Sequence, residues 1–166
     1  MYRNTIQYLV ALVVFVAIGC NKGKNSEDGT RAVSEQQQVD LRQKWHWDNN
    51  KGQSDAAGYA QVVKVGPTIY VSGVPTSDLS PVGVAQLYGT LRACLESFGA
   101  TPQDVVKETL YTTDIEAMKL LNDHRKEFYE GDFPAASWVE VSRLYEPTAK
   151  LEVDLVAYLP ATGERK

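Results

Sequence analysis

Hydrophobic and polar positions divide the chain into three parts. Leu9 to Ile18 is almost wholly apolar, residues 21–43 carry almost no aliphatic periodicity, and short β-branched runs begin at Ala60. The apolar run is typical of a signal-peptide core, because a membrane-spanning helix needs roughly 20 apolar residues. The polar stretch cannot bury enough apolar surface to fold. The pattern therefore predicts one folded domain that follows a leader and a flexible tether.

The folded part alternates between strand and helix signals. Ser80-Pro81 begins a helix that ends near Gly99, and Asp114 begins a second helix that Gly131 ends, because these residue types cap helices. The predicted strands combine β-branched residues with flanking turn signals, and they cover residues 60–65, 68–74, 105–113, 136–144 and 150–158.

This order of elements predicts an α/β (α+β) domain with a mixed sheet of five or six strands. Two helices can cover only one face of such a sheet, which leaves the other face without a partner in the same chain. We expect that face to be buried against another copy, so the pattern predicts an oligomer. Cys94 falls on the apolar side of the first helix, where we interpret it as a buried, unreactive thiol.

The end of the leader has its own pattern. Ala17-Ile18-Gly19-Cys20 resembles the lipobox of bacterial lipoproteins, although leucine is usual where Ala17 stands. The resemblance implies acylation of Cys20, and acyl chains hold a protein firmly on a membrane. An ordinary secretory signal with an incidental cysteine is the alternative. We predict a signal peptide, a lipidated cysteine with its tether, and a domain, at residues 1–19, 20–43 and 44–166. The predicted location is the periplasmic side or the outer membrane, with membrane contact through the lipid anchor only.

The charge of the chain argues against a nucleic-acid partner. The formal net charge is -4, and no Lys/Arg cluster forms the basic stripe that phosphate binding needs. His46 and His124 are the two histidines, and no cysteine or carboxylate cluster has ligand spacing, so no metal site is predicted. The composition favours a small-molecule ligand or a protein partner.

Five short motifs follow one another along the domain. They are Gly58-Tyr59-Ala60-Gln61, Ile69–Gly73, Asp104–Lys107 with Tyr111–Asp114, Phe133-Pro134-Ala135, and Leu151–Asp154. Each motif alone is weak evidence. Together, in this order and with only local insertions, they resemble the Rid family, the reactive intermediate deaminases or YjgF-like proteins.

The resemblance implies a fold, an assembly and an activity. Rid proteins have a chorismate-mutase-like fold with two helices on one face of the sheet, and they assemble as homotrimers. Their ligand sites lie in three clefts between adjacent subunits. The best-known members hydrolyse reactive enamines and imines to 2-keto acids and ammonia, without a metal or an organic cofactor.

The resemblance also assigns roles to four positions. Glu152 matches a glutamate that orients or activates water, Tyr59 a ring that lines the pocket, and Ser72 a hydroxyl near the ligand. In deaminating members an arginine directly after Phe-Pro-Ala binds the substrate carboxylate through two parallel hydrogen bonds. Ala136 stands at that position in this chain. Ordinary strand packing would equally explain Tyr59 and Ser72, and a solvated or paired carboxylate would explain Glu152.

Several neighbours of Ala136 bear on this loss. Arg143 lies an odd number of residues further along the predicted strand, so it should face the opposite side. Lys150, on the adjoining strand, is the other candidate cation, but strand parity alone does not place its ammonium in the cleft. Trp138 should share a face with Ala136, where its ring either shapes the pocket for an apolar or aromatic ligand or fills the trimer core. Trp45-His46-Trp47 either packs against an edge of the sheet or contacts a ligand.

Three functions follow from these residues. The first is hydrolysis of an enamine, imine or related C–N bond in an intersubunit cleft, with Glu152 managing the water. The second is binding of a small ligand by a trimeric lipoprotein without turnover, which the alanine at position 136 favours. Ribonuclease activity ranks last, because this acidic chain has no paired histidines or basic groove.

Overall fold

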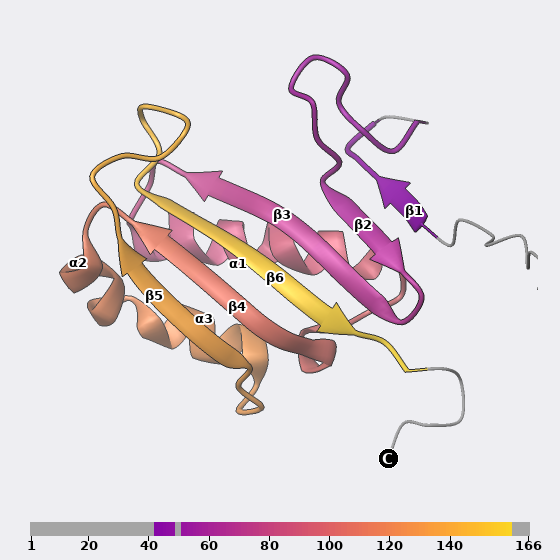
Figure 1. Ribbon diagram of the computed structural model, residues 1–166. Coiled ribbons are helices and arrows are strands. Elements are labelled where there is room, and N and C mark those ends of the chain that lie inside the picture. The colour runs from indigo at the N-terminus through magenta and orange to yellow at the C-terminus, as the bar shows by residue number, and fades with distance from the viewer. Residues whose placement is uncertain (1–41, 49–50, 161–166) are drawn as a thin grey trace, which may run out of the picture. The chain divides into compact units, whose positions relative to one another are not determined.

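The computed structural model describes residues 42–48 and 51–160, and within these ranges six strands form one sheet (Figure 1). The strands are β1 (Arg42–Trp45), β2 (Val62–Val65), β3 (Thr68–Thr76), β4 (Val105–Thr112), β5 (Ala135–Glu140) and β6 (Leu151–Tyr158). They lie in the order β1-β2-β3-β6-β4-β5. Paired strands run antiparallel except β4 and β5, which are parallel. The predicted mixed α+β sheet is confirmed.

The helices lie on one face of this sheet (Figure 1). They are α1 (Pro81–Glu96), α2 (Ile115–Leu120) and α3 (Asn122–Tyr129), with a short 3-10 helix at Pro102–Asp104. Both predicted helix starts are confirmed. The Ser80 hydroxyl accepts a hydrogen bond from the Gly83 N–H at 3.2 Å, and the Asp114 carboxylate accepts one from the Ala117 N–H at 2.9 Å. Side-chain caps of this kind satisfy N–H groups that the first turn leaves free.

Two predicted boundaries were wrong. The second helix was expected to be continuous, but it divides at Leu121, whose φ and ψ of -96° and 6° are not helical. No glycine or proline marks that division. The strand expected to reach residue 144 ends at Glu140. Arg143 therefore lies outside the strand, and strand parity does not decide which way its side chain points.

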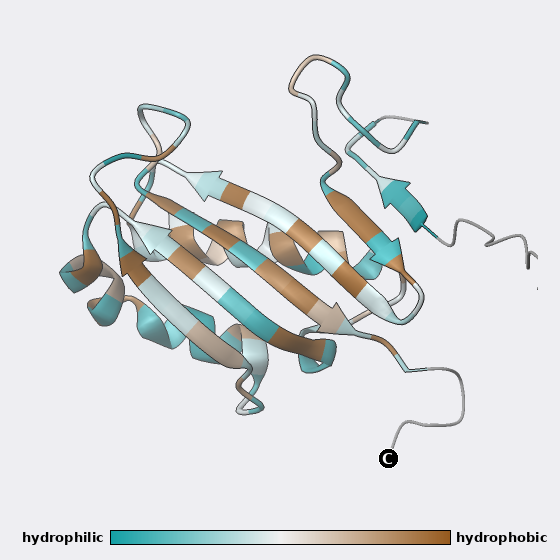
Figure 2. Ribbon diagram, in the orientation of Figure 1, coloured by the Kyte–Doolittle hydropathy of each residue, from teal (hydrophilic) through white to brown (hydrophobic). Residues whose placement is uncertain are grey.

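The core lies between the sheet and the helix layer. Along β3, β4 and β6, buried residues alternate with more exposed ones, and Figure 2 shows this alternation as changing hydropathy along the strands. The buried strand residues include Ile69, Val71, Leu110, Val153 and Leu155, and α1 adds Val84, Leu87, Leu91, Cys94 and Leu95. Cys94 is fully buried in this core, as predicted, and burial raises the pKa of its thiol to about 12.

The N-terminal strand β1 extends the sheet beyond the first predicted strand. Trp45 pairs with Val62 of β2 and packs against the core, so this tryptophan packs at the sheet edge. The strand begins at Arg42, two residues before the predicted domain start. The lipobox with Cys20 lies outside the described residues. None of the described helices is long and apolar enough to cross a membrane.

Candidate functional site

A bulge in β3 forms the centre of the candidate site. The pairing between β3 and β6 shifts register between Val71 and Val74, so Ser72 and Gly73 lie outside the regular ladder. Three hydrogen bonds fix this bulge. The Ser72 hydroxyl donates to the Ala60 carbonyl at 2.9 Å, the Ser72 N–H donates to the Gln61 carbonyl at 2.9 Å, and the Gln61 amide donates to the Ser72 carbonyl at 2.8 Å. The bulge is therefore tied to the segment that follows Tyr59.

Gly73 provides the space that Glu152 occupies. Glu152 lies on β6, opposite Pro75 of β3 and Tyr111 of β4. Its carboxylate lies directly over Gly73, where a Cβ atom at that position would overlap its Oε1. Any larger residue at position 73 would displace the Glu152 carboxylate, so the bulge and its glycine together define where this carboxylate can lie.

The surroundings of Glu152 disfavour its charged form. Its pKa is raised, first by partial burial and then by the nearby Asp154 carboxylate. Among the described residues, none is found to donate a hydrogen bond to either carboxylate. A carboxylate with a raised pKa and unsatisfied oxygens is a stronger base than an ordinary glutamate. Glu152 can therefore accept a proton from a water molecule at this face of the sheet.

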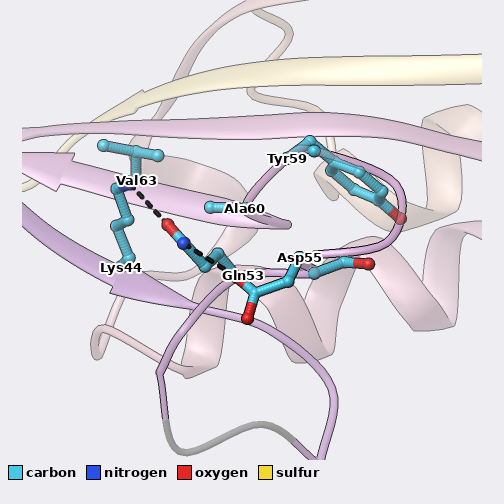
Figure 3. A pocket seen from close by; sticks show the side chains of 8 residues that line it. Lys44, Gln53, Asp55, Tyr59, Ala60 and Val63 are labelled. Atoms are coloured by element: carbon cyan, nitrogen blue, oxygen red, sulfur yellow. Dashed lines mark hydrogen bonds between the residues drawn. The ribbon is translucent and has the colours of Figure 1, made fainter.

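Tyr59 stands directly before Ala60 and Gln61, the two residues that are hydrogen-bonded to the bulge, and its ring lies beside β1. Its side chain is 42% exposed, and its ring meets the His46 ring edge-to-face at 5.2 Å between centroids. It lines a hollow of about 320 Å³ (Figure 3). There Gln53 accepts a hydrogen bond from Lys44 at 2.8 Å and donates one to Asp55 at 3.2 Å. Trp45-His46-Trp47 thus packs at the edge and also contacts the predicted pocket ring. In the described part of the chain, no three His, Cys, Asp or Glu side chains gather where a metal ion could bind.

Ala136 and Trp138 lie on the opposite face of the sheet from Glu152. In the parallel pair of β4 and β5, Ala136 is level with Glu108 and Trp138 with Leu110, and both of these β4 residues are buried under the helices. Glu152 is level with Tyr111, one position further along β4. Because successive strand residues point to opposite faces, one subunit does not bring all the predicted site residues together. The prediction that Ala136 and Trp138 share a face is confirmed.

Sequence reasoning missed two residues that position the site. Gln61 is 3% exposed and its amide holds the bulge, and Gly73 makes room for the Glu152 carboxylate. Both stand inside motifs already noted for their resemblance, Gly58-Tyr59-Ala60-Gln61 and Ile69–Gly73. The residue types carried a signal, but their roles depend on a register shift that strand patterns do not reveal.

Comparison with known families and sequences agrees with this architecture. The family model described as Endoribonuclease L-PSP matches residues 51–159. A 2-iminobutanoate/2-iminopropanoate deaminase from Dermatophagoides farinae is 32% identical over 110 residues, which cover 61% of this chain and 85% of that protein. A protein of the same name from Rattus norvegicus is 32% identical over 117 residues, or 65% of this chain and 85% of its own length.

Solved structures have the same fold. A Mycobacterium tuberculosis member of the YjgF/YER057c/UK114 family is 26% identical, with a TM-score of 0.63 over 71% of this chain and 99% of that one. A Rid-family protein from Yersinia pestis is 25% identical, with a TM-score of 0.62 and the same coverage of 71% and 99%.

Proposed function

Because the chain belongs to the Endoribonuclease L-PSP family, which includes the YjgF and Rid proteins, we propose that it hydrolyses the C–N bond of a small imine or enamine. The observation that carries the proposal is the placement of Glu152. Its carboxylate is partly buried over Gly73, beside a second carboxylate, and its pKa is raised. The deaminase names of the sequence relatives support the same class of reaction.

The reaction needs only water and a group that moves protons. Glu152 accepts a proton from water as the oxygen adds to the imine carbon, and returns that proton to the nitrogen. The resulting amino alcohol then transfers its hydroxyl proton to the nitrogen through Glu152, expels ammonia and leaves a carbonyl. An enamine first gains a proton on carbon and loses one from nitrogen, which gives the imine. General-base catalysis of this kind contributes about 10²- to 10⁴-fold to a rate. We propose that Tyr59 lines the pocket, and that Ser72 fixes the bulge at the pocket edge through its hydrogen bond to the Ala60 carbonyl.

We further propose that the site forms between copies in a homotrimer. Glu152 and Ala136 lie on opposite faces of one sheet, so a pocket containing both needs a second copy. β5 is an edge strand, and the face that carries Glu152 has no described helix over it. Light scattering of the purified chain should report a trimer, and a monomer would remove the intersubunit site.

Ligand binding without turnover is the second candidate. Ala136 supports it, because the resemblance places a carboxylate-binding arginine there and a methyl group cannot supply two N–H donors. In this alternative the bulge and Glu152 would bind a ligand that the protein does not alter. Endoribonuclease activity is the least favoured function, since the described residues of the site form no basic groove that could bind RNA.

The location of the protein is also a proposal. The lipobox-like segment supports lipidation at Cys20, with residues 1–19 as signal peptide, residues 20–43 as anchor and tether, and residues 44–166 as the domain on the periplasmic side or at the outer membrane. Replacing Cys20 with alanine should abolish acylation and membrane fractionation. Unchanged fractionation would contradict the lipobox.

An imine-trapping assay tests the proposed reaction. An amino-acid oxidase generates imines, semicarbazide captures them, and the protein should divert them to keto acids and ammonia. The rate should fall about 100-fold or more in Glu152→Gln, which keeps the shape but removes the base. Glu146→Gln, on the exposed segment before β6, is the matched control and should keep the wild-type rate. Equal rates in wild type and Glu152→Gln would contradict the role of Glu152, and an inactive wild type would favour the binding function.

A further inference from the structure

Two tryptophans fix the segment that follows β1. Trp45 pairs with Val62 of β2 and packs against the core. The Trp47 ring meets the Trp45 ring edge-to-face, with 4.5 Å between their centroids. His46 stands between them in the sequence, and its Nδ1 lies 3.3 Å from the Trp47 carbonyl oxygen, close enough for an Nδ1–H to donate to it. The His46 ring is therefore held by neighbours that are tied to the edge of the sheet.

A closed turn fixes the main chain of Tyr59. The Ser54 N–H donates to the Tyr59 carbonyl at 2.7 Å, and the Gly58 N–H donates to the Ser54 carbonyl at 2.9 Å. Gly58 has a φ of 75°, in the left-handed region that glycine adopts without a steric penalty. The turn therefore delivers the Tyr59 side chain from one defined position, at the wall of the hollow that Figure 3 shows.

The Tyr59 side chain itself depends on one ring contact. It is exposed, and no described residue is found to form a hydrogen bond with its hydroxyl. Among the described aromatic residues, His46 is the one whose ring is found against it, at 5.2 Å between centroids and an angle of 69° between the ring planes. Edge-to-face pairs of this kind are attractive. The orientation of the Tyr59 ring is therefore set by His46.

This ring contact is separate from the groups that place the proposed base. The Glu152 carboxylate lies over Gly73, in the space that the glycine leaves. The bulge that carries Gly73 is fixed by hydrogen bonds in which neither the His46 ring nor the Tyr59 side chain takes part. A change at His46 therefore alters the wall of the pocket and leaves the Glu152 carboxylate where it is.

We infer that His46 is a positioning residue, which fixes the Tyr59 ring as a wall for the side chain of the substrate and so sets the preference of the site for large apolar side chains. The inference rests on the proposed hydrolysis of imines in a pocket lined by Tyr59. A ring that is already fixed binds an apolar group without first losing its own conformational freedom. A small substrate does not reach the ring, so its binding does not depend on His46.

Kinetics of the full chain with two imines test the inference. The oxidase generates the imine of phenylalanine, which has a large side chain, and that of alanine, which has a small one. His46→Ala should raise KM for the phenylalanine imine about 3- to 10-fold, leave its kcat unchanged and leave the alanine imine unaffected. His46→Phe should match wild type, because it keeps a ring against Tyr59 and removes a buried Nε2 that has no described partner.

The other histidine of the chain provides the matched control. His124 lies on α3 in the helix layer, so His124→Ala should leave the kinetics of both imines unchanged. Equal losses for the two imines in His46→Ala, or no loss for either, would overturn the inference. The same loss in His124→Ala, or a loss in His46→Phe as large as that in His46→Ala, would also overturn it. If His46→Ala does not fold, His46→Leu replaces it, because leucine fills space without an aromatic edge.

Nuclear magnetic resonance relaxation of the tyrosine rings tests the positioning role without turnover. In the wild-type full chain, the Tyr59 ring should be more ordered than that of Tyr145, which is 87% exposed. His46→Ala should remove this difference, and His46→Phe should keep it. If these results hold but wild type hydrolyses no imine, the hydrolase proposal fails and the positioning of Tyr59 by His46 stands. If wild type hydrolyses imines while its Tyr59 ring is as mobile as that of Tyr145, the hydrolase proposal stands and this inference is overturned.

Discussion

The carboxylates on the two faces of the sheet differ in their hydrogen bonds and ion pairs. On the helix side, Glu108 is fully buried and bonded to both Arg125 and Tyr88. On the open side, Glu152 and Asp154 lie two residues apart on β6, and no described cation or donor is found to bond either of them. Burying a charge is costly unless it is paired, so the buried Glu108 carboxylate depends on its partners, whereas the two carboxylates of the open face have no described partner to lose.

This difference separates the residues that hold the fold from those that can do chemistry. A paired, buried carboxylate has no free oxygen for a water molecule, whereas an unpaired one with a raised pKa can take a proton from it.

The largest effect should come from breaking the buried ion pair. Glu108→Ala leaves Arg125 buried without its partner, which should cost about 3–5 kcal/mol in the free energy of unfolding. Asp154→Ala, on the open face, removes a carboxylate with no such partner and should cost far less. Urea unfolding followed by circular dichroism measures both. Similar losses in the two variants would show that the faces do not differ in this way.

A pair of neighbours on β4 extends the comparison to apolar packing. Leu110 is fully buried under the helices, so Leu110→Ala should cost about 2–5 kcal/mol. Thr109 points to the open face, and Thr109→Ala should change the free energy of unfolding by about 0.5 kcal/mol or less in an isolated chain. A larger loss for Thr109→Ala, seen only at protein concentrations where the chain is oligomeric, would place this face in a subunit interface.

Gly73→Ala should change the site without changing the fold. The added methyl overlaps the end of the flexible Glu152 side chain, which can turn away, so stability should change little. The displaced carboxylate should lower imine hydrolysis by about 10- to 100-fold, because misplacement by about 1 Å is enough for such a loss. As the carboxylate moves toward solvent, the pKa of Glu152 should fall toward its usual range, which carboxyl-carbon resonances can follow. Gly89→Ala, where a methyl meets nothing within 4 Å, is the control and should show neither effect.

Residue patterns predicted the elements better than they predicted the site. Ser80-Pro81 and Asp114 fixed the two helix starts because each cap is a local hydrogen bond. No breaker residue marks the division at Leu121 or the end of β5 at Glu140, so the residue pattern did not predict either boundary. Boundaries made by a local hydrogen bond could therefore be predicted from the sequence, and boundaries without a local signal could not.

The candidate site also could not be assembled from the sequence alone. Strand alternation placed Ala136 and Trp138 together but could not relate them to Glu152, because that needs the strand order. Arg125 carried a signal that went unused: it stands four residues after Leu121 and three before Phe128, at an inward position of the helical pattern. A charged residue at such a position points to a buried partner, but the sequence does not identify Glu108 as that partner.

The smallest predicted effect is a gain in stability when Glu152 is replaced by glutamine. A carboxyl whose pKa is raised in the folded chain binds protons more tightly there than in the unfolded chain. Its contribution is therefore fully present below the usual glutamate pKa of 4.5 and is lost as pH rises through the raised value. Glu152→Gln carries no charge at any pH, so it should match wild type at acid pH and exceed it at neutral pH. The gain should be below about 1 kcal/mol, because the carboxylate is partly exposed and screened.

Glu140→Gln is a poor control for this prediction because the Glu140 carboxylate accepts a hydrogen bond from the Ile115 N–H. Glu146→Gln, on an exposed segment, is the better control and should not change the free energy of unfolding at any pH. Thermal unfolding between acid and neutral pH measures the difference. If Glu152→Gln were less stable than wild type at neutral pH, Glu152 would have a stabilising partner, and the contrast between the two faces would fail at the residue on which the proposed function depends.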